Sequence, residues 1–143
     1  MPCLSGTYNP EVGILVQVAI VPGGHVEQIQ DQGSDQPPIN AMAVAGLMDT
    51  GADATCISPN VVQQLSLVAT GKIQTAGVTG VKPANQYTVD LILKFGANAI
   101  AKQNMIVTEY AFQSSHFDVL IGRDIICSGV LTMEFSGRFS FSV

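Results

Sequence analysis

The amino-acid sequence predicts one all-β domain, over residues 1–143, with one or two short helices. Apolar residues make up 47% of the 143 residues, which is enough to build the core of a single domain. Short runs rich in β-branched residues recur along the chain, and turn-forming Gly, Pro, Asn and Ser separate them. Residues 86–95 also alternate in character with a period of two, which is typical of a strand.

The first part of the chain is expected to form strands around a polar loop and a sharp turn. Residues 13–21 and 39–48 are apolar and flanked by turn residues, so we expect two largely buried strands. Residues 22–38 between them are polar and contain a double proline, which predicts a long surface loop. Two interpretations of this loop remain open: a tolerated insertion, and a segment that contacts substrate or regulates the protein. Residues 54–57 leave the turn as a short strand.

The next segment is expected to form a short helix followed by a hairpin. Ser58 and Pro59 suit the N-cap and the first position of a helix that ends near Leu65. Strand-like residues 68–75 and 86–95 then flank a segment with two glycines, which suit a tight turn. The remaining elements are strands at 100–108 and 119–121, a helix over 124–127, and a hairpin of 131–135 with 139–143.

The charge of the chain limits the classes of partner. The formal net charge of −5 argues against nucleic acid, which binds basic surfaces. Charged residues make up only 12% of the chain, which suggests that part of the surface lies against a second copy of itself. Three acids outside the main motif, Asp90, Glu109 and Asp118, are expected to be solvated.

Cysteine usage and hydropathy bear on the compartment. Cys3, Cys56 and Cys127 are odd in number and widely spaced, which fits a reducing compartment and lacks the spacing of metal ligands. No apolar run approaches the roughly 20 residues of a membrane-spanning helix, and the N-terminus does not resemble a signal peptide. We therefore expect a cytoplasmic location, with no metal and no cofactor.

The most informative stretch runs from Leu47 to Ser58. Leu47 and Met48 lead into Asp49, and Thr50-Gly51 then turns the chain. Burying an acid next to apolar residues costs free energy, so an acid at this position indicates a functional role. We therefore expect the protonation state of Asp49 to matter.

Two motifs in this sequence resemble those of one enzyme family. Met48-Asp49-Thr50-Gly51-Ala52 resembles the active-site loop of the aspartic proteases. Residues 118–126, with an apolar pair before Gly122-Arg123 and an apolar segment after it, resemble the second element of the retroviral branch. From Val12 onward the chain thus resembles a retropepsin-like aspartic protease. The resemblance implies a closed β-barrel or sandwich with a flap hairpin, assembled as a symmetric homodimer.

The resemblance also implies roles for particular residues. Asp49, Thr50 and Gly51 would be catalytic: Thr50 would lock the two loops across the two-fold axis, and Gly51 would let the backbone approach the substrate. Asp53 would bind substrate backbone and contact Arg123, whose buried guanidinium suits that contact. The residues expected to bind substrate are Ala52, Asp53, Ala54, Cys56 and, at the flap tip, Gly77, Val78 and Thr79.

The structural interpretation stays beside the catalytic one for several of these residues. Gly122 and Arg123, and Asp53 in its contact with Arg123, are expected to support the fold and the dimer rather than the chemistry. Cys56 is expected to be a small wall rather than a reactive thiol. Asp124 stands where retroviral relatives often carry Asn, with no predicted consequence. The flap residues also fit an ordinary hairpin.

One chain carries only one Asp-Thr/Ser-Gly, whereas peptide hydrolysis by carboxylates needs two acids. Two copies related by a two-fold axis would supply them. The sequence therefore predicts an aspartic endopeptidase that acts on a peptide or protein as a homodimer. The alternative is a retropepsin-like dimerisation or peptide-binding module that no longer cleaves.

Two other Asp-centred motifs fail on their spacing. Phosphotransferases of the dehalogenase type need a second acid where this chain has Gly51. A calcium loop needs alternating oxygen ligands over about twelve residues, but apolar residues and a cysteine follow Asp53.

Overall fold

The computed structural model of the protein describes residues 3–23, 41–77 and 80–143. Val78, Thr79 and nearly all of the expected 22–38 loop therefore lie outside the described residues. The strand before that loop continues through Pro22. No helix of the described part of the chain is long and apolar enough to cross a membrane.

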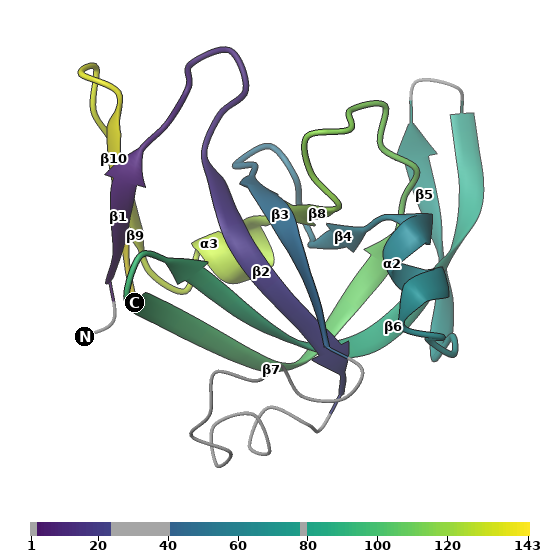
Figure 1. The fold of residues 1–143 in the computed structure, drawn as a ribbon. Coiled ribbons are helices and arrows are strands. Elements are labelled where there is room, and N and C mark those ends of the chain that lie inside the picture. The colour runs from purple at the N-terminus through teal and green to yellow at the C-terminus, as the bar shows by residue number, and fades with distance from the viewer. Residues whose placement is uncertain (1–2, 24–40, 78–79) are drawn as a thin grey trace.

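The described residues form an all-β fold with two short helices (Figure 1). The strands are β1 (Cys3–Thr7), β2 (Leu15–Pro22), β3 (Met42–Met48), β4 (Cys56–Ile57), β5 (Gly71–Gly77), β6 (Gly80–Phe95), β7 (Asn98–Glu109), β8 (Val119–Ile121), β9 (Val130–Met133) and β10 (Arg138–Ser142). The helices are α2 (Pro59–Gln64) and α3 (Arg123–Ile126). The predicted elements are present, with shifted ends except for the strand at 119–121, and β1 was not predicted.

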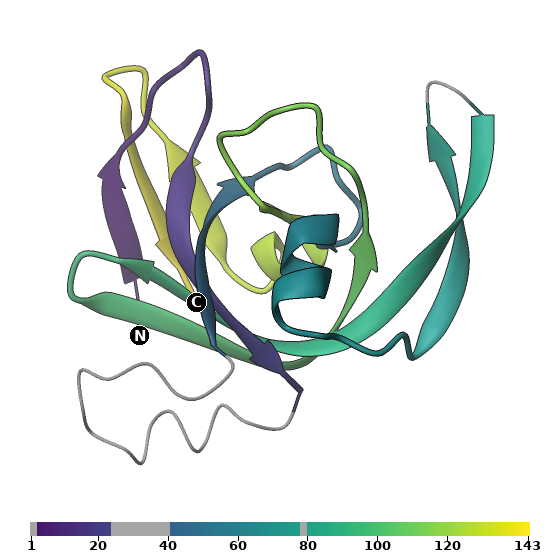
Figure 2. The ribbon, with the colours of Figure 1, turned by 45° about the vertical axis from the view of Figure 1, so that its right-hand side comes forward.

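The main sheet closes into a barrel. Its strand order is β2-β3-β8-β4-β7-β6-β5, and β2 also pairs with β6. The long β5–β6 hairpin continues beyond the barrel at one side and rises toward the same end as the β3–β4 loop (Figures 1 and 2). The expected hairpin is therefore present, with Gly77 paired to Gly80 across its arms.

A smaller sheet joins both ends of the described chain, in the order β1-β10-β9. Leu4 of β1 is fully buried, and it lies opposite Phe141 of β10. At Gly6 the ring of Phe95 occupies the space that a Cβ atom would need, so any other residue would displace that ring. Phe95 in turn packs edge-to-face on Phe139, with 5.2 Å between ring centroids. These contacts hold the small sheet against the barrel.

The core follows the two-residue period of the strands. Val16, Val18 and Ile20 of β2 are buried, as are Val89 and Leu91 of β6. Because alternate side chains of a strand point to the same face, these residues meet inside the barrel. The predicted period of residues 86–95 thus accounts for the inner face of β6.

The expectation of solvated acids is wrong for Asp90, whereas Glu109 and Asp118 are partly exposed. Asp90 is fully buried and accepts a hydrogen bond from the Asn104 backbone N–H at 2.8 Å, beside a register shift between β6 and β7. Asn104 has a φ of +54°, so the carboxylate stabilises a strained bulge. Asp118 accepts from the Ser58 hydroxyl at 2.7 Å, and Glu109 accepts from the Tyr87 hydroxyl at 3.2 Å. All three acids have structural partners.

Candidate active site

Asp49 lies in the β3–β4 loop, residues 49–55, which leaves the barrel where β3 ends. This segment is called the Asp49 loop. β3 runs parallel to β8, with Met48 opposite Ile121. The Asp49 backbone N–H donates to the Ile121 carbonyl at 2.9 Å, and the Met48 N–H donates to Ile14 at 3.0 Å. The end of β8 on one side and the residue before β2 on the other therefore determine where Asp49 lies before the turn begins.

The turn itself orients the carboxylate. Asp49 is half-buried, and its Oδ1 accepts a hydrogen bond from the Gly51 N–H at 2.8 Å. The Ala52 N–H donates to the Asp49 carbonyl at 3.2 Å and closes the turn. A Cβ at Gly51 would stand 3.2 Å from Oδ1, which is tighter than usual packing. The backbone of the Thr50-Gly51 turn thus holds one carboxylate oxygen in place.

The β8–α3 junction binds this loop through Arg123, the first residue of α3. Arg123 donates from its backbone N–H to the Ala52 carbonyl at 2.9 Å and from Nη1 to the Thr50 carbonyl at 3.0 Å. Its Nη2 forms an ion pair with Asp53, which is the contact expected from the sequence. The expected burial is absent, however, because the two side chains are 45% and 88% exposed. An ion pair this exposed contributes little stability, so its effect in the single chain is orientation.

A second, more buried set of contacts was not predicted. Thr55 is fully buried, and Asp124 accepts from its backbone N–H at 2.9 Å and from its hydroxyl at 2.7 Å. The Thr55 hydroxyl oxygen accepts in turn from the Gly122 N–H at 3.2 Å. At Gly122 a Cβ would lie 2.6 Å from the Ala54 carbonyl carbon, so glycine is required by the close approach. The only local signal was a polar Thr55 inside an apolar run.

Cys56 lies in β4 with its side chain half-buried. Burial raises the pKa of its thiol, and the nearby Asp124 carboxylate raises this pKa further. The thiol is therefore protonated at neutral pH and is a poor nucleophile. This agrees with the expectation that Cys56 is not a reactive thiol.

The other expected substrate-binding residues are spread over two elements. Ala52 is half-buried, while Asp53 and Ala54 are exposed on the β3–β4 loop. Gly77 ends β5, in the hairpin arm, and the flap-tip residues after it lie outside the described residues. The structure thus groups Ala52, Asp53 and Ala54 beside Asp49 and places the hairpin arm on a separate element.

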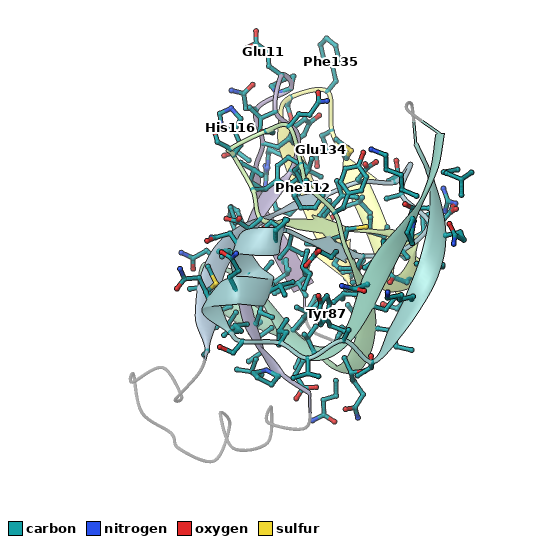
Figure 3. All side chains as sticks on the ribbon, turned by 90° about the vertical axis from the view of Figure 1, so that its right-hand side faces the viewer. Glu11, Tyr87, Phe112, His116, Glu134 and Phe135 are labelled. Carbon is teal, nitrogen blue, oxygen red and sulfur yellow. The ribbon has the colours of Figure 1, made fainter. Side chains whose placement is uncertain are left out.

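The loop between β7 and β8 carries an aromatic cluster that the sequence did not single out. Tyr110 and Phe112 have ring centroids 5.6 Å apart, and Phe112 and Phe117 have centroids 4.9 Å apart. In Figure 3 the labelled Phe112 and His116 lie toward the end of the molecule at which the β3–β4 loop leaves the barrel. This cluster offers an apolar surface at that end.

A surface cavity of the described residues does not coincide with the Asp49-Thr50-Gly51 motif. A hollow of about 430 Å³ is lined by residues of β2, of β3 and of the end of β6, among them Val16, Ala45 and Lys94. None of the residues of the Asp49 loop lines it. That hollow lacks a convergent set of reactive groups, so the hydrogen-bonded Asp49 loop is the candidate active site. Among the described residues, no three His, Cys, Asp or Glu side chains form a group that could hold a metal.

Comparisons with known proteins bear on the family and on the fold. The family described as retroviral aspartyl protease matches residues 7–133. A crystal structure of a retropepsin-like aspartic protease from Rickettsia conorii is similar in fold, with a TM-score of 0.61 and 11% identity, over 97% of this chain and 89% of that one. The EIAV protease in complex with the inhibitor HBY-793 matches with a TM-score of 0.47 and 21% identity, over 86% and 93% of the two chains.

No curated protein matches the chain in sequence. The family match nevertheless spans most of the 143 residues and includes both motifs. The chain therefore belongs to the retroviral aspartyl protease family.

Proposed function

We propose that the protein is an aspartic endopeptidase whose active site contains Asp49 from each of two protomers. The observation that carries this proposal is the Asp49 carboxylate, held by the Gly51 N–H in a loop that Arg123 clamps. Membership of the protease family supports the reaction class. The presence of a single such loop in the chain supports the shared site.

The chemistry follows from two adjacent carboxyl groups. Like charges in contact do not both ionise, so the pair holds one proton, as aspartic proteases are known to do. The ionised Asp49 takes a proton from water while the water oxygen attacks the peptide carbonyl carbon. The neutral Asp49 donates a hydrogen bond to the carbonyl oxygen as negative charge develops there. The tetrahedral intermediate then breaks its C–N bond as a proton passes to the leaving amine.

Small, uncharged residues in the Asp49 loop and in β4 support a preference of the enzyme for substrates with apolar side chains beside the scissile bond. Ala52 and Ala54 are small, and the Cys56 thiol is uncharged at neutral pH for the reasons given above. We propose that these residues, with Asp53 for substrate backbone and the hairpin tip at Gly77, Val78 and Thr79, bind the peptide. Arg123 and Gly122 support the loop without touching the substrate.

The test is cleavage of a peptide mixture at mildly acidic pH by the wild type and by Asp49→Asn. The amide cannot accept the proton from water, so we expect cleavage to fall by about 10²–10⁴-fold. Fragments are identified by mass spectrometry. Glu11→Gln is the matched control, because Glu11 is an exposed acid in a turn outside the loop, and its activity should equal that of the wild type. Equal fragment patterns from the wild type and Asp49→Asn would contradict the proposal and favour a module that only binds peptides.

A further inference from the structure

The outer face of the barrel is largely apolar along β2. The core-facing residues of this strand alternate with an outward row made of Leu15, Gln17, Ala19 and Val21. The outward row of a solvated antiparallel strand is usually polar, yet Gln17 is the one polar residue of this row. Val21 is buried against Ile92, with Ala19 packed on both, as a second and smaller apolar cluster. At the other end of the row, the apolar surface is open in the hollow of about 430 Å³.

Three strands build this hollow. Gln17 of β2 lies opposite Lys94 of β6 and opposite Ala45 of β3, so the three side chains share one face. Leu15 and Ala45 are half-buried, and Phe95 at the end of β6 completes the apolar lining. The β6–β7 turn, which follows Phe95, lies beside the small sheet in Figures 1 and 2. The volume of the hollow falls within the range of about 300–1,000 Å³ that is typical of ligand sites.

The hollow carries a positive charge. Of the described residues that line it, Lys94 alone is charged. No acid in the described part of the chain forms an ion pair with Lys94. Asp118, whose backbone N–H donates to the Ala45 carbonyl, has its carboxylate bound by the Ser58 hydroxyl at 2.7 Å. The whole chain has 11 acids and six Lys and Arg residues, so this hollow attracts an anion on a protein that otherwise repels one.

These groups match the last residue of a peptide. The Lys94 ammonium attracts a carboxylate, and the apolar lining takes up an aliphatic side chain. The Gln17 amide has both donors and an acceptor, which suits the peptide group before the last residue. A fatty acid has no polar group besides its carboxylate and would leave this amide unused. Capture of a C-terminal carboxylate is a recurring form of peptide recognition.

We propose that the hollow binds the free C-terminus of a peptide whose last residue is apolar. The carboxylate lies at Lys94 and the last peptide group at Gln17. The last side chain packs on Leu15 and Ala45. This inference rests on the proposed function, because cleavage beside an apolar residue releases peptides that end in this way. The hollow shares β3 with the active site, but none of its lining residues belongs to the Asp49 loop, so a released product can occupy it while the next substrate binds.

Chemical-shift mapping by NMR tests the site, with acetyl-dialanyl-leucine as the probe. The protein is the full chain with Asp49→Asn, which prevents hydrolysis during the titration. The backbone amides of Gln17, Ala45 and Lys94 should shift until the site is saturated. The same peptide with a C-terminal amide should bind about threefold to fivefold more weakly, because an exposed lysine contributes modestly to an ion pair. Shifts confined to the Asp49 loop, or equal binding of the acid and the amide, would overturn the proposal.

Two variants in the Asp49→Asn background assign the contacts. Lys94→Gln should weaken binding of the peptide acid about threefold to fivefold and leave binding of the peptide amide unchanged. Lys82→Gln is the matched control, since Lys82 is an exposed lysine of the same strand, and it should bind as the parent does. Gln17→Ala should weaken binding of the peptide acid but not of decanoate. Decanoate binding tighter than that of the peptide acid would indicate a lipid site and overturn the assignment to a peptide.

Cleavage by the wild type separates this site from the proposed function. If the wild type cleaves peptides and the amides that line the hollow do not shift with the probe, the site is wrong and the protease proposal stands. If the wild type does not cleave and the shifts appear and depend on Lys94, the protease proposal fails and the site stands.

Discussion

At the scale of single residues, two acids beside the loop have different energetic roles. Asp53 pairs with Arg123 at the surface, where water and ions screen the attraction. Asp124 accepts both a backbone and a hydroxyl hydrogen bond from fully buried Thr55. When a buried donor loses its acceptor, the fold is destabilised by the full desolvation penalty of that donor. The carboxylate of Asp124 should therefore stabilise the loop more than that of Asp53.

Replacement of Asp124 tests this difference. Asp124→Ala should lower the free energy of unfolding by about 1–3 kcal/mol, because the Thr55 N–H loses its acceptor. Asp124→Asn keeps one acceptor oxygen and should lose less. Asp53→Ala is the control and should cost about 0–1 kcal/mol. Urea denaturation monitored by circular dichroism measures all three, and equal losses for Asp124→Ala and Asp53→Ala would contradict the assignment.

At the scale of elements, the site depends on how two segments pass each other. The β3–β4 loop and the β8–α3 junction touch through backbone atoms, and the closest approach is at Gly122 and Ala54. The flanking strands continue the contact, since Cys56 of β4 lies opposite Leu120 of β8. Backbone atoms cannot rotate away as a side chain can. This junction should therefore tolerate added volume poorly.

Gly122→Ala measures that tolerance. Its Cβ would lie 2.6 Å from the Ala54 carbonyl carbon, so the two segments must separate, at a cost of about 1–3 kcal/mol in unfolding free energy. Peptidase activity should fall as well, because the Asp49 loop shifts with Ala54. Gly71→Ala is the control: its nearest neighbour is a glutamine side-chain atom at 3.4 Å, and its stability should stay within about 0.5 kcal/mol of the wild type. A Gly122→Ala protein as stable and active as the wild type would show that the approach is not critical.

At the scale of the whole molecule, each chain contributes one Asp49 loop to the proposed active site. If the active site is built from two chains, the activity of the wild type changes when inactive chains are mixed with it. If the site lies within one chain, that activity does not change. The same reasoning applies to dilution, which separates protomers by mass action. The two cases are therefore distinguished without any knowledge of the substrate.

The expected result is that excess Asp49→Asn protein suppresses the wild type. After subunits exchange, the share of dimers that are active should equal the square of the wild-type fraction, because mixed dimers hold one acid and one amide. At constant wild-type concentration, cleavage should therefore fall in proportion to the wild-type fraction. Cleavage is measured at constant wild-type concentration while the variant is added. The Glu11→Gln protein, added in the same amounts, should not suppress. Activity that is independent of added Asp49→Asn would exclude a shared pair.

The fold was largely predictable because local patterns agree with the tertiary structure. The strand at 119–121 was predicted with its observed bounds, and the Ser58 hydroxyl accepts from the Val61 N–H as an N-cap should. β1 was missed because Cys-Leu-Ser-Gly-Thr is short and interrupted by glycine, and its strand conformation depends on pairing with β10 at the other end of the chain. The burial of Asp90 was missed because its partner Asn104 lies in a bulge that the two-residue period does not reveal.

The sequence by itself determined the turn at Asp49, the order of the two motifs and the family to which they belong, because these depend on residues close together in the chain. Tertiary structure alone decided that Asp124 binds Thr55, that Gly122 must lack a Cβ and that the Arg123–Asp53 pair is open to solvent. Thr55 and Asp124 are 69 positions apart. Whether such residues meet, and whether water reaches them, depends on how the barrel closes rather than on any local preference.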